Sequence, residues 1–528
     1  MGAGQREHGA QRRALGRVRE QHVDRPGPRR AQQQRELVAG CDLEAAQPGV
    51  EHQLDDHRLL AGLEVRSPAL WAPHPPERRR EVGLDRVEID HQRWRDQPVQ
   101  ARRERLIQPL AGGLVGHRHT VAWYRSAMSD AHQFRSFEPP LRMLMGPGPS
   151  DVHPRVLQAM ARPTIGHLDP AFVDLMDEVK RLLQYAMRTD NPLTFPISAP
   201  GSAGMEACLV NLIEPGDTVI VGRNGVFGGR MHSIIERAGG RAIAVDDAWG
   251  SPVDPDKVEA ALKQHPEASL LAFVHAETST GALSDAARLA ELARAHGCLT
   301  VVDAVTSLAG VPLEVDAWGL DAVYSGSQKC MSCAPGLSPV SFSARAVERI
   351  QARKTPVQSW FLDLSLVMGY WDGGAKRAYH HTAPVNAIYG LHEALLMVHE
   401  EGLEQAWARH QLHHRALAAG LSAMGMRLRV APEHRLPQLN VVELPAGLDD
   451  GATRARLLRD YGLEVGGGLG DLAGKVWRIG LMGTACTRRN VLGCIAAIDD
   501  VLRGAAPDAG KGLGVAAALA AYGMSEQP

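Results

Sequence analysis

The turn Ser-Gly-Ser-Gln-Lys at residues 325–329 places Lys329 directly after a predicted strand. A lysine amine attacks an electrophile only after it loses its proton, which requires partial desolvation or nearby cations. On a small-residue loop at the end of a strand, Lys329 is well positioned to form an imine with an aldehyde. The motif alone is a weak signal, because most lysines are solvated surface residues.

Asp303 follows the apolar run 299–302. Open α/β sheets bind their ligands at the carboxyl ends of the strands, so Asp303 is expected at such an edge. A carboxylate there can pair with a protonated ring nitrogen and hold its positive charge. An aspartate that caps the next helix is an equally reasonable interpretation of this residue taken by itself.

Two further patterns are suited to anions. Gly201 and Ser202 open a predicted helix in the stretch GSAGMEA, and free N–H groups beside a hydroxyl form a cradle for phosphate. Arg478, in VWRIG, can bind a carboxylate with two parallel hydrogen bonds. Glycine-rich helix starts and surface ion pairs of arginine are both common, so neither pattern decides the function alone.

Short apolar runs alternate with helical segments after about residue 141, which is typical of parallel βαβ units. Buried strands are predicted at 218–221, 270–274, 299–302 and 322–324, with a helix at 285–296 that Gly297 terminates. Beyond residue 400 the pattern predicts a smaller α+β domain, with helices at 403–424 and 489–502 and strands at 427–430 and 438–443. We therefore expect a large domain at 128–400, a small domain at 401–505 and a flexible tail at 506–528.

The first quarter of the chain has a different composition. Residues 1–127 contain 22 Arg against 17 Asp and Glu, a formal charge of +5, with no Lys and no sustained apolar period. We interpret them as a disordered extension, or as an upstream reading frame translated from a mis-assigned start, with Met128 as the true start. A transit peptide would carry few acids, and a nucleic-acid-binding module would show a compact helical pattern with a basic face.

The whole chain has 528 residues, a formal net charge of −2 and 44% apolar residues, which is ordinary globular composition. The balance of charge gives no overall case for binding nucleic acid or an acidic membrane. No run of about eighteen apolar residues predicts a membrane span. Seven scattered cysteines do not resemble a secreted disulfide framework, so we expect a cytoplasmic protein.

The order of the four features is more specific than any one of them: cradle, aspartate, a lysine about 26 residues later, then arginine in a second domain. Residues 141–502 resemble the class V aminotransferases of fold type I. Within these they most resemble the alanine–glyoxylate and serine–glyoxylate (serine–pyruvate) aminotransferase family. The resemblance is carried, in chain order, by MGPGPS, NPLTFPISAPGSAGMEA, LIEPGDTVIVGRNGVFGGR, ETSTG, VVDAVTSLAG, YSGSQK, YHHTAPV and KVWRIGLMG.

The resemblance implies a mainly parallel, seven-stranded sheet, the cofactor pyridoxal 5′-phosphate and a homodimer. Lys329 corresponds to the lysine that binds the cofactor's aldehyde and moves the Cα proton, and Asp303 to the partner of its ring nitrogen. Arg478 corresponds to the clamp of the substrate carboxylate. The resemblance also implies the remaining cofactor contacts. Thr278 would lie beside the phenolic oxygen and Phe227 against the ring, where relatives often have Trp. The phosphate would meet Gly201, Ser202 and Gln328, and also Tyr379 and Thr382 from the partner subunit.

One position departs from the family pattern. Relatives commonly have Gly-Thr or Gly-Ser directly before the cradle glycine, whereas this chain has Ala199-Pro200. Proline offers neither an N–H group nor a hydroxyl, so one phosphate contact is expected to be lost or replaced by another group.

Other candidate sites have simpler interpretations. Cys330 and Cys333 form a C-x-x-C pair without a second pair at zinc-finger spacing, so we expect buried thiols and no metal site. The adjacent His380 and His381 are expected to point to opposite faces of a strand. His167 is either a substrate contact or an ordinary loop histidine, and the glycine run 466–468 is expected to form a turn.

The resulting hypothesis is a ping-pong transamination between alanine or serine and a small 2-oxo acid, glyoxylate or pyruvate. A related aminotransferase acting on 2-aminoethylphosphonate or pyridoxamine is the alternative. Cysteine desulfuration would need a mobile catalytic cysteine loop, which we do not find. An aminotransferase-like ligand sensor in a transcription regulator would need a winged helix-turn-helix pattern in residues 1–127.

Overall fold

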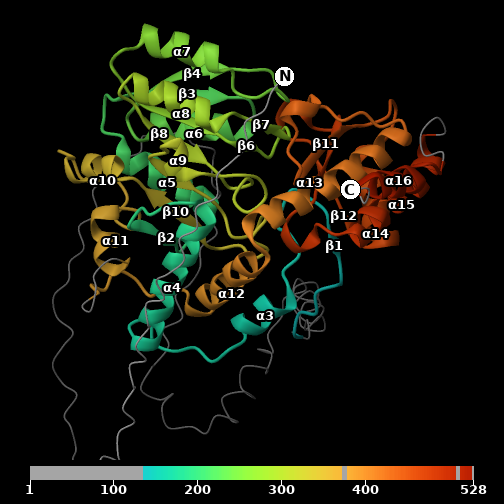
Figure 1. Ribbon diagram of the computed structural model, residues 1–528, viewed down its shortest axis with the longest axis horizontal. Coiled ribbons are helices and arrows are strands. Elements are labelled where there is room, and N and C mark those ends of the chain that lie inside the picture. Colours follow the sequence, from blue (N-terminus) through green and yellow to red (C-terminus); the bar gives the residue numbers. More distant parts are fainter. Residues whose placement is uncertain (1–134, 372–376, 507–511, 526–528) are drawn as a thin grey trace, which may run out of the picture. The chain divides into compact units, whose positions relative to one another are not determined.

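The computed structural model describes residues 135–371, 377–506 and 512–525. The interpretation of residues 1–127 therefore lies outside the described residues. Within the described part, the chain builds two main hydrophobic cores. One surrounds a large sheet and the other a small sheet, and both sheets can be followed in Figure 1. No helix among the described residues is long and apolar enough to cross a membrane.

The large sheet has seven strands in the order β2-β10-β9-β8-β5-β3-β4. All neighbouring pairs are parallel except those that β10 makes with β2 and β9. This confirms the predicted mainly parallel, seven-stranded sheet. The strands are β2 Leu193–Ile197, β3 Thr218–Arg223, β4 Arg241–Asp246, β5 Ala268–Val274, β8 Leu299–Asp303, β9 Ala322–Tyr324 and β10 Ser338–Phe342.

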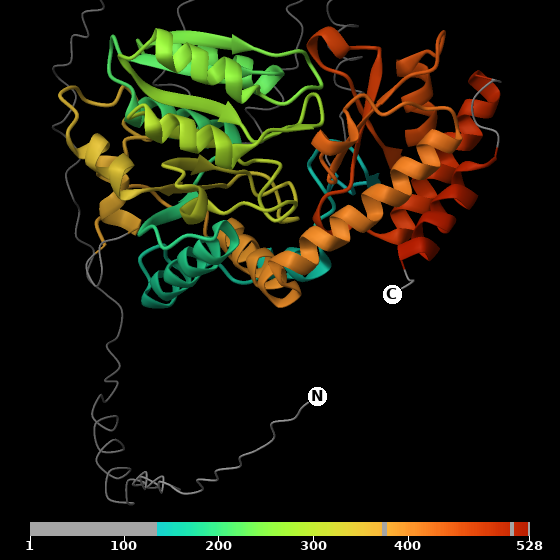
Figure 2. The same ribbon diagram turned by 45° about the horizontal axis from the view of Figure 1, so that its top comes forward.

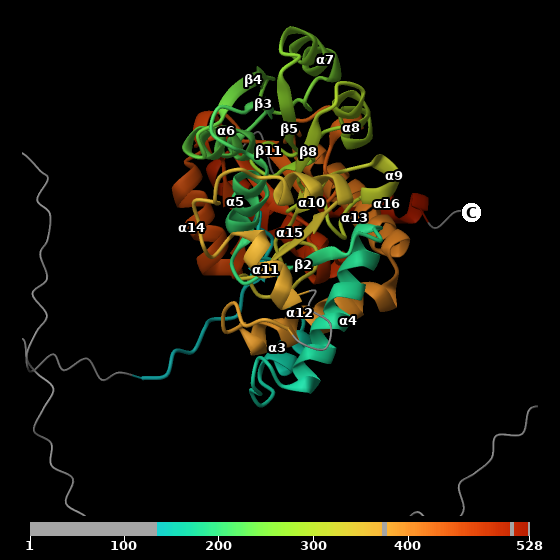
Figure 3. The same cartoon turned by 90° about the vertical axis from the view of Figure 1, so that its left-hand side faces the viewer.

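Helices cover both faces of this sheet, which explains why β5 and β8 are buried along nearly their whole length. Figure 3 shows α5 and α6 on one side of β3, β5 and β8, and α8 and α9 on the other. The helices of this part are α3 Pro154–Met160, α4 Pro170–Met187, α5 Gly201–Leu212, α6 Val226–Arg237, α7 Pro255–Gln264, α8 Ala286–Ala295, α9 Val315–Trp318, α10 Ala344–Gln351, α11 Leu364–Trp371 and α12 Val385–Glu401. The strands β6 Ala276–Glu277 and β7 Ala282–Leu283 form a separate hairpin.

The second core surrounds the antiparallel sheet β11-β14-β13, with Trp477 of β14 completely buried. The helix α13 runs from the end of α12 toward this sheet, as its orange ribbon shows in Figure 2. The elements of this part are α13 Leu403–Ala423, β11 Leu439–Glu443, α14 Asp450–Tyr461, β12 Leu463–Glu464, β13 Gly466–Gly467, β14 Val476–Gly480, α15 Arg488–Ala505 and α16 Gly514–Ser525.

Three expectations need correction. The strand β1 Met143–Leu144 pairs with β12 and Met145 lies in the second core, so the start of the predicted large domain belongs structurally to the small one. The predicted strand 427–430 is reduced to one isolated bridge between Leu428 and Val442. A short segment can satisfy its backbone in several ways, and local periodicity does not reveal which strand edge is available.

The predicted flexible tail is wrong for residues 514–525, which form α16 along α13. Ala518 and Tyr522 are buried, and the Tyr522 hydroxyl lies 2.7 Å from His413 Nδ1. The two helices approach closely at glycines, because a Cβ added to Gly420 would come within 3.0 Å of the Gly514 carbonyl oxygen. An Ala/Gly-rich helix lacks a strong amphipathic signal, yet its small side chains allow this close packing.

Candidate active site

Seven of the ten predicted site residues line one cavity of about 230 Å³ at the carboxyl ends of β8 and β9. Asp303 is the last residue of β8, and Lys329 lies on the loop that follows β9. The two strands are paired in parallel, so their carboxyl ends meet at the same edge of the sheet. The seven residues are Gly201, Ser202, Phe227, Thr278, Asp303, Gln328 and Lys329.

Most of the Lys329 side chain is shielded from solvent, and its amine donates a hydrogen bond to the Pro147 carbonyl oxygen. A Cβ at Gly148 would come within 2.5 Å of Lys329 Nζ, so this glycine is required for the close approach. Burial, followed by the charge of Arg478, lowers the pKa of Lys329 to about 8. The amine can therefore lose its proton far more readily than a solvated lysine, as the predicted chemistry requires.

The Asp303 carboxylate is completely enclosed and oriented by two donors. Tyr324 donates its hydroxyl to Asp303 Oδ2 at 2.7 Å, and the Val305 N–H group donates to Oδ1 at 2.8 Å. Burial raises the pKa of Asp303 to about 6. A buried carboxylate with this little compensation favours a cationic partner in the cavity.

The opposite end of the cavity has the character of an anion cradle. The helix α5 begins at Gly201 after Pro200, and no side chain caps its first turn. Gln328 is half-buried and lines the same cavity, and its buried Oε1 atom has no hydrogen-bond partner among the described residues. An uncapped helix N-terminus offers free N–H groups of the kind that bind a phosphate ester, and the Nε2 group of an amide such as Gln328 can also donate.

Phe227 is held in place by a residue that the sequence analysis did not single out. Glu277 is fully buried, and its Oε2 accepts hydrogen bonds from the N–H groups of Phe227 at 3.2 Å and Gly228 at 3.3 Å. Its Oε1 accepts from both the N–H and the hydroxyl of Ser279. Burial raises the pKa of Glu277. Locally, the sequence shows only that Glu277 begins the segment ETSTG. Its role could not be read there, because the start of α6, which it caps, lies 50 residues earlier in the chain.

Arg478 does not line the cavity but reaches its edge from the second core. Its Nε donates to the Gly467 carbonyl oxygen at 2.8 Å, and its Nη1 lies 3.5 Å from the Thr278 carbonyl oxygen. Burial lowers the pKa of Arg478 to about 10. The Thr278 hydroxyl forms a hydrogen bond with the Thr306 hydroxyl. The structure therefore brings Arg478 beside a cavity residue that lies 200 positions away in the chain.

Tyr379 and Thr382 do not join the cavity within one chain. Both are exposed, and 63% of the Tyr379 surface is accessible. Their assignment to a partner subunit stays a prediction. The ring of His167 lies 5.5 Å from that of Tyr379, so it accompanies this loop and not the cavity.

The cysteine pair and the adjacent histidines, which the sequence also offered as candidate sites, lie outside the cavity of Lys329 and Asp303. Cys330 and Cys333 are buried free thiols, and burial raises the pKa of each to about 12. His380 and His381 lie outside any strand, and their Nδ1 atoms form a hydrogen bond at 2.8 Å, so the expectation that they point apart is wrong. Across the described residues, no group of three His, Cys, Asp or Glu side chains is arranged to hold a metal ion.

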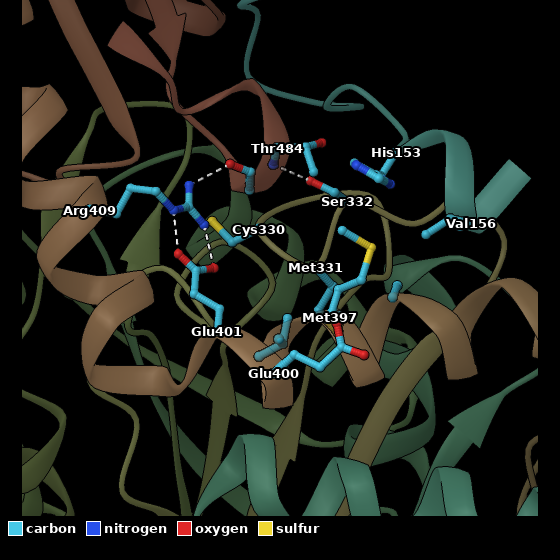
Figure 4. A pocket seen from close by; sticks show the side chains of 13 residues that line it. His153, Val156, Cys330, Met331, Ser332, Met397, Glu400, Glu401, Arg409 and Thr484 are labelled. Atoms are coloured by element: carbon cyan, nitrogen blue, oxygen red, sulfur yellow. Dashed lines mark hydrogen bonds and ion pairs between the residues drawn. The ribbon is translucent and has the colours of Figure 1, made fainter.

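A second cavity of about 300 Å³ lies behind the lysine loop, between the two cores (Figure 4). Arg409 forms an ion pair with Glu401 and donates to the Gly483 carbonyl oxygen at 2.7 Å. The Thr484 N–H group donates to Ser332 Oγ at 2.8 Å. The bond between Thr484 and Ser332 ties the loop after Lys329 to the small domain, and the bonds of Arg409 occupy its guanidinium.

Comparison with known proteins agrees with this architecture. Residues 147–496 match the sequence profile of the family "Aminotransferase class-V", and the chain belongs to this family. It is 38% identical to the (S)-ureidoglycine–glyoxylate transaminase of Bacillus subtilis over 71% of this chain and 94% of that protein. It is 42% identical to the alanine–glyoxylate aminotransferase of Callithrix jacchus over 67% and 85% of the two chains.

The solved structure of alanine–glyoxylate aminotransferase from Nostoc sp. superposes with a TM-score of 0.69 at 48% identity, covering 70% of this chain and 98% of that one. The fold is therefore that of the fold type I aminotransferases, as the resemblance implied. Class V aminotransferases depend on pyridoxal phosphate.

Proposed function

We propose that this enzyme transfers an amino group from alanine or serine to glyoxylate or pyruvate, with pyridoxal 5′-phosphate as its cofactor. The observation that carries the proposal is the shared cavity of Lys329 and Asp303, an amine that deprotonates readily and a buried carboxylate that favours a cation. The glyoxylate named in the titles of several relatives supports a small 2-oxo acid as the acceptor.

The residues of the cavity fit the cofactor. Lys329 would hold its aldehyde carbon, Asp303 its ring nitrogen, and Phe227 the face of its ring. Thr278 would contact the phenolic oxygen, and the phosphate would bind at the start of α5 with Ser202 and Gln328. When bound, pyridoxal phosphate supplies an electron sink that takes up the charge left on the substrate Cα.

The chain's own residues would then move the proton and orient the substrate. Lys329 Nζ takes the proton from the substrate Cα, which its lowered pKa favours near neutral pH. The Asp303 carboxylate would pair with the protonated ring nitrogen, and the Tyr324 hydroxyl holds this carboxylate in place. Arg478 binds the carboxylate that both substrates share, and a single arginine clamp suits monocarboxylates. The first product leaves before the acceptor binds to the same residues, and this order gives ping-pong kinetics.

We further propose that the enzyme acts as a homodimer. Tyr379 and Thr382 are exposed in the single chain, and the ring of His380 between them stacks on the exposed Trp360, with ring centres 4.5 Å apart. A second copy of the chain would cover these side chains. Tyr379 and Thr382 of one subunit would then reach the phosphate cradle of the other. Sedimentation equilibrium of the purified enzyme should give twice the chain mass, and a monomer with full activity would contradict this part.

The test of the proposed function is a half-reaction assay. The enzyme, loaded with pyridoxal phosphate, is mixed with alanine, serine, ureidoglycine, 2-aminoethylphosphonate or pyridoxamine in separate samples without an acceptor. Loss of the visible cofactor absorbance, and its return on addition of glyoxylate or pyruvate, identifies donor and acceptor. A response to pyridoxamine or 2-aminoethylphosphonate alone would favour the alternative substrates. An enzyme that binds no pyridoxal phosphate would refute the proposal.

A further inference from the structure

The phosphate cradle of this chain lacks donors at one position. Pro200 is the N-cap residue of α5, where a hydroxyl or an N–H group would otherwise meet an anion. The cradle must bind a doubly charged ester with the donors that remain. Another group on the cavity wall is therefore needed to complete it.

Arg230 lines the same cavity from the neighbouring helix α6. Its Nη1 donates a hydrogen bond to Ser202 Oγ at 2.9 Å, and its Cζ atom lies 4.9 Å from the centre of the Phe227 ring. These two contacts place the guanidinium between the cradle serine and the aromatic ring. The sequence analysis did not single out Arg230, because its helix and α5 are separate in the chain and meet only after folding.

The Arg230 guanidinium has donors to spare. It carries five N–H bonds, and a carboxylate partner would normally occupy two of them. Among the residues that the structure describes, Arg230 forms no ion pair with an Asp or Glu side chain, although many arginines on the surface do. An arginine without an acidic partner at a helix-N-terminal cradle is suited to a phosphate.

We propose that Arg230 is a ligand of the cofactor's 5′-phosphate and replaces the donors that Pro200 cannot supply. This inference rests on the proposed function, since it assumes that pyridoxal phosphate occupies the cavity. It assigns the substrate carboxylate to Arg478 and the phosphate to Arg230, so the two cations act on different anions.

The test compares cofactor binding with and without the phosphate group. The full-length chain is freed of cofactor, and the dissociation constants of pyridoxal phosphate and of pyridoxal are measured by tryptophan fluorescence. We expect Arg230→Gln to weaken pyridoxal phosphate about tenfold or more, because a charge-assisted hydrogen bond is lost, and to leave pyridoxal unchanged. Arg237→Gln is the matched control, since Arg237 is also exposed on α6 and contacts a serine hydroxyl at 3.4 Å.

A second variant tests the replacement directly. Pro200→Ser restores a hydroxyl and an N–H group to the cradle, so Pro200→Ser combined with Arg230→Gln should regain part of the lost affinity. No recovery in the double variant would contradict the idea that the two positions substitute for each other. Inorganic phosphate should stabilise the cofactor-free wild type against heat more than it stabilises Arg230→Gln.

The outcomes separate this inference from the proposed function. If the wild type binds neither pyridoxal phosphate nor pyridoxal, the proposed function itself fails. If the wild type prefers pyridoxal phosphate and Arg230→Gln retains that preference, only the role of Arg230 is wrong. Equal weakening of both ligands would show that Arg230 acts through the Phe227 ring, which also overturns the inference. An increase in KM for the amino acid with an unchanged cofactor affinity would assign Arg230 to the substrate instead.

Discussion

Tyr324 donates its hydroxyl to the Asp303 carboxylate at 2.7 Å, and the two residues are also direct register partners in the parallel strands β8 and β9. Both side chains are buried. The strand pairing therefore fixes the donor opposite the acceptor before any ligand enters. Because the hydroxyl stabilises the charged carboxylate, this bond opposes the effect of burial on the pKa of Asp303.

Removing that hydroxyl should weaken the site without emptying it. In Tyr324→Phe the pKa of Asp303 should rise further above 6, and kcat should fall about tenfold, since a hydrogen bond to a buried charge is worth roughly 1.5–3 kcal/mol. Steady-state kinetics with alanine and glyoxylate provide the measurement. Tyr522→Phe is the control, because the Tyr522 hydroxyl contacts His413 away from the cavity. Equal loss in both variants would point to general destabilisation.

The buried amine of Lys329 should make the stability of the cofactor-free enzyme depend on pH. Its pKa is about 8 in the folded chain and 10.5 when solvated, so between these values the unfolded chain binds more protons and stability rises with pH. Relative to Lys329→Met, the wild type should gain on the order of 3 kcal/mol from pH 8 to pH 10.5. The measurement is the free energy of unfolding of both proteins in urea across this pH range. If the two free energies changed with pH in the same way, the lowered pKa of Lys329 would be refuted. The same substitution should abolish transamination.

The contact between Gly148 and Lys329 predicts a steric effect. In Gly148→Ala the new methyl group would lie 2.5 Å from Lys329 Nζ, so the amine should be displaced and the visible absorbance of bound cofactor should be lost. Gly447→Ala is the matched control, because Gly447 also has a positive φ but a Cβ there would meet nothing within 4 Å. Both variants place a Cβ on a residue with positive φ, and only Gly148→Ala adds a close contact with another side chain. Normal cofactor binding by Gly148→Ala would show that the lysine has another position available.

Arg478 should act on the substrate and not on the cofactor. Arg478→Gln should raise KM for alanine and for glyoxylate about a hundredfold, because a two-point contact with the carboxylate is lost, while pyridoxal phosphate binding stays within about twofold. The pKa of Lys329 should also rise, since Arg478 contributes to lowering it. Measuring KM for both substrates and the dissociation constant of pyridoxal phosphate in the same variant checks the effects on substrate and on cofactor. A large loss of cofactor affinity with unchanged KM would reverse the assignment.

Much of the large domain was readable from local patterns, because strands buried on both faces are continuous apolar runs. The runs at 270–274 and 299–302 became β5 and β8, and the predicted helix at 285–296 became α8 with Asp285 as its cap. The ends of these strands then located Asp303 and Lys329. Pairings between distant segments could not be read in this way: β1 with β12 and α16 with α13 depend on edges and small-residue faces that have no periodic signal.

The sequence by itself determined the order of cradle, aspartate, lysine and arginine, and with it the class of fold and the residues that could do chemistry. Only the tertiary structure decided which side chains support them: Glu277 under Phe227, Tyr324 against Asp303 and Arg230 beside Ser202. The physical reason is that a residue's type is local, whereas its burial and its hydrogen-bond partners are set by segments 20 to 50 positions away that meet only in the folded sheet.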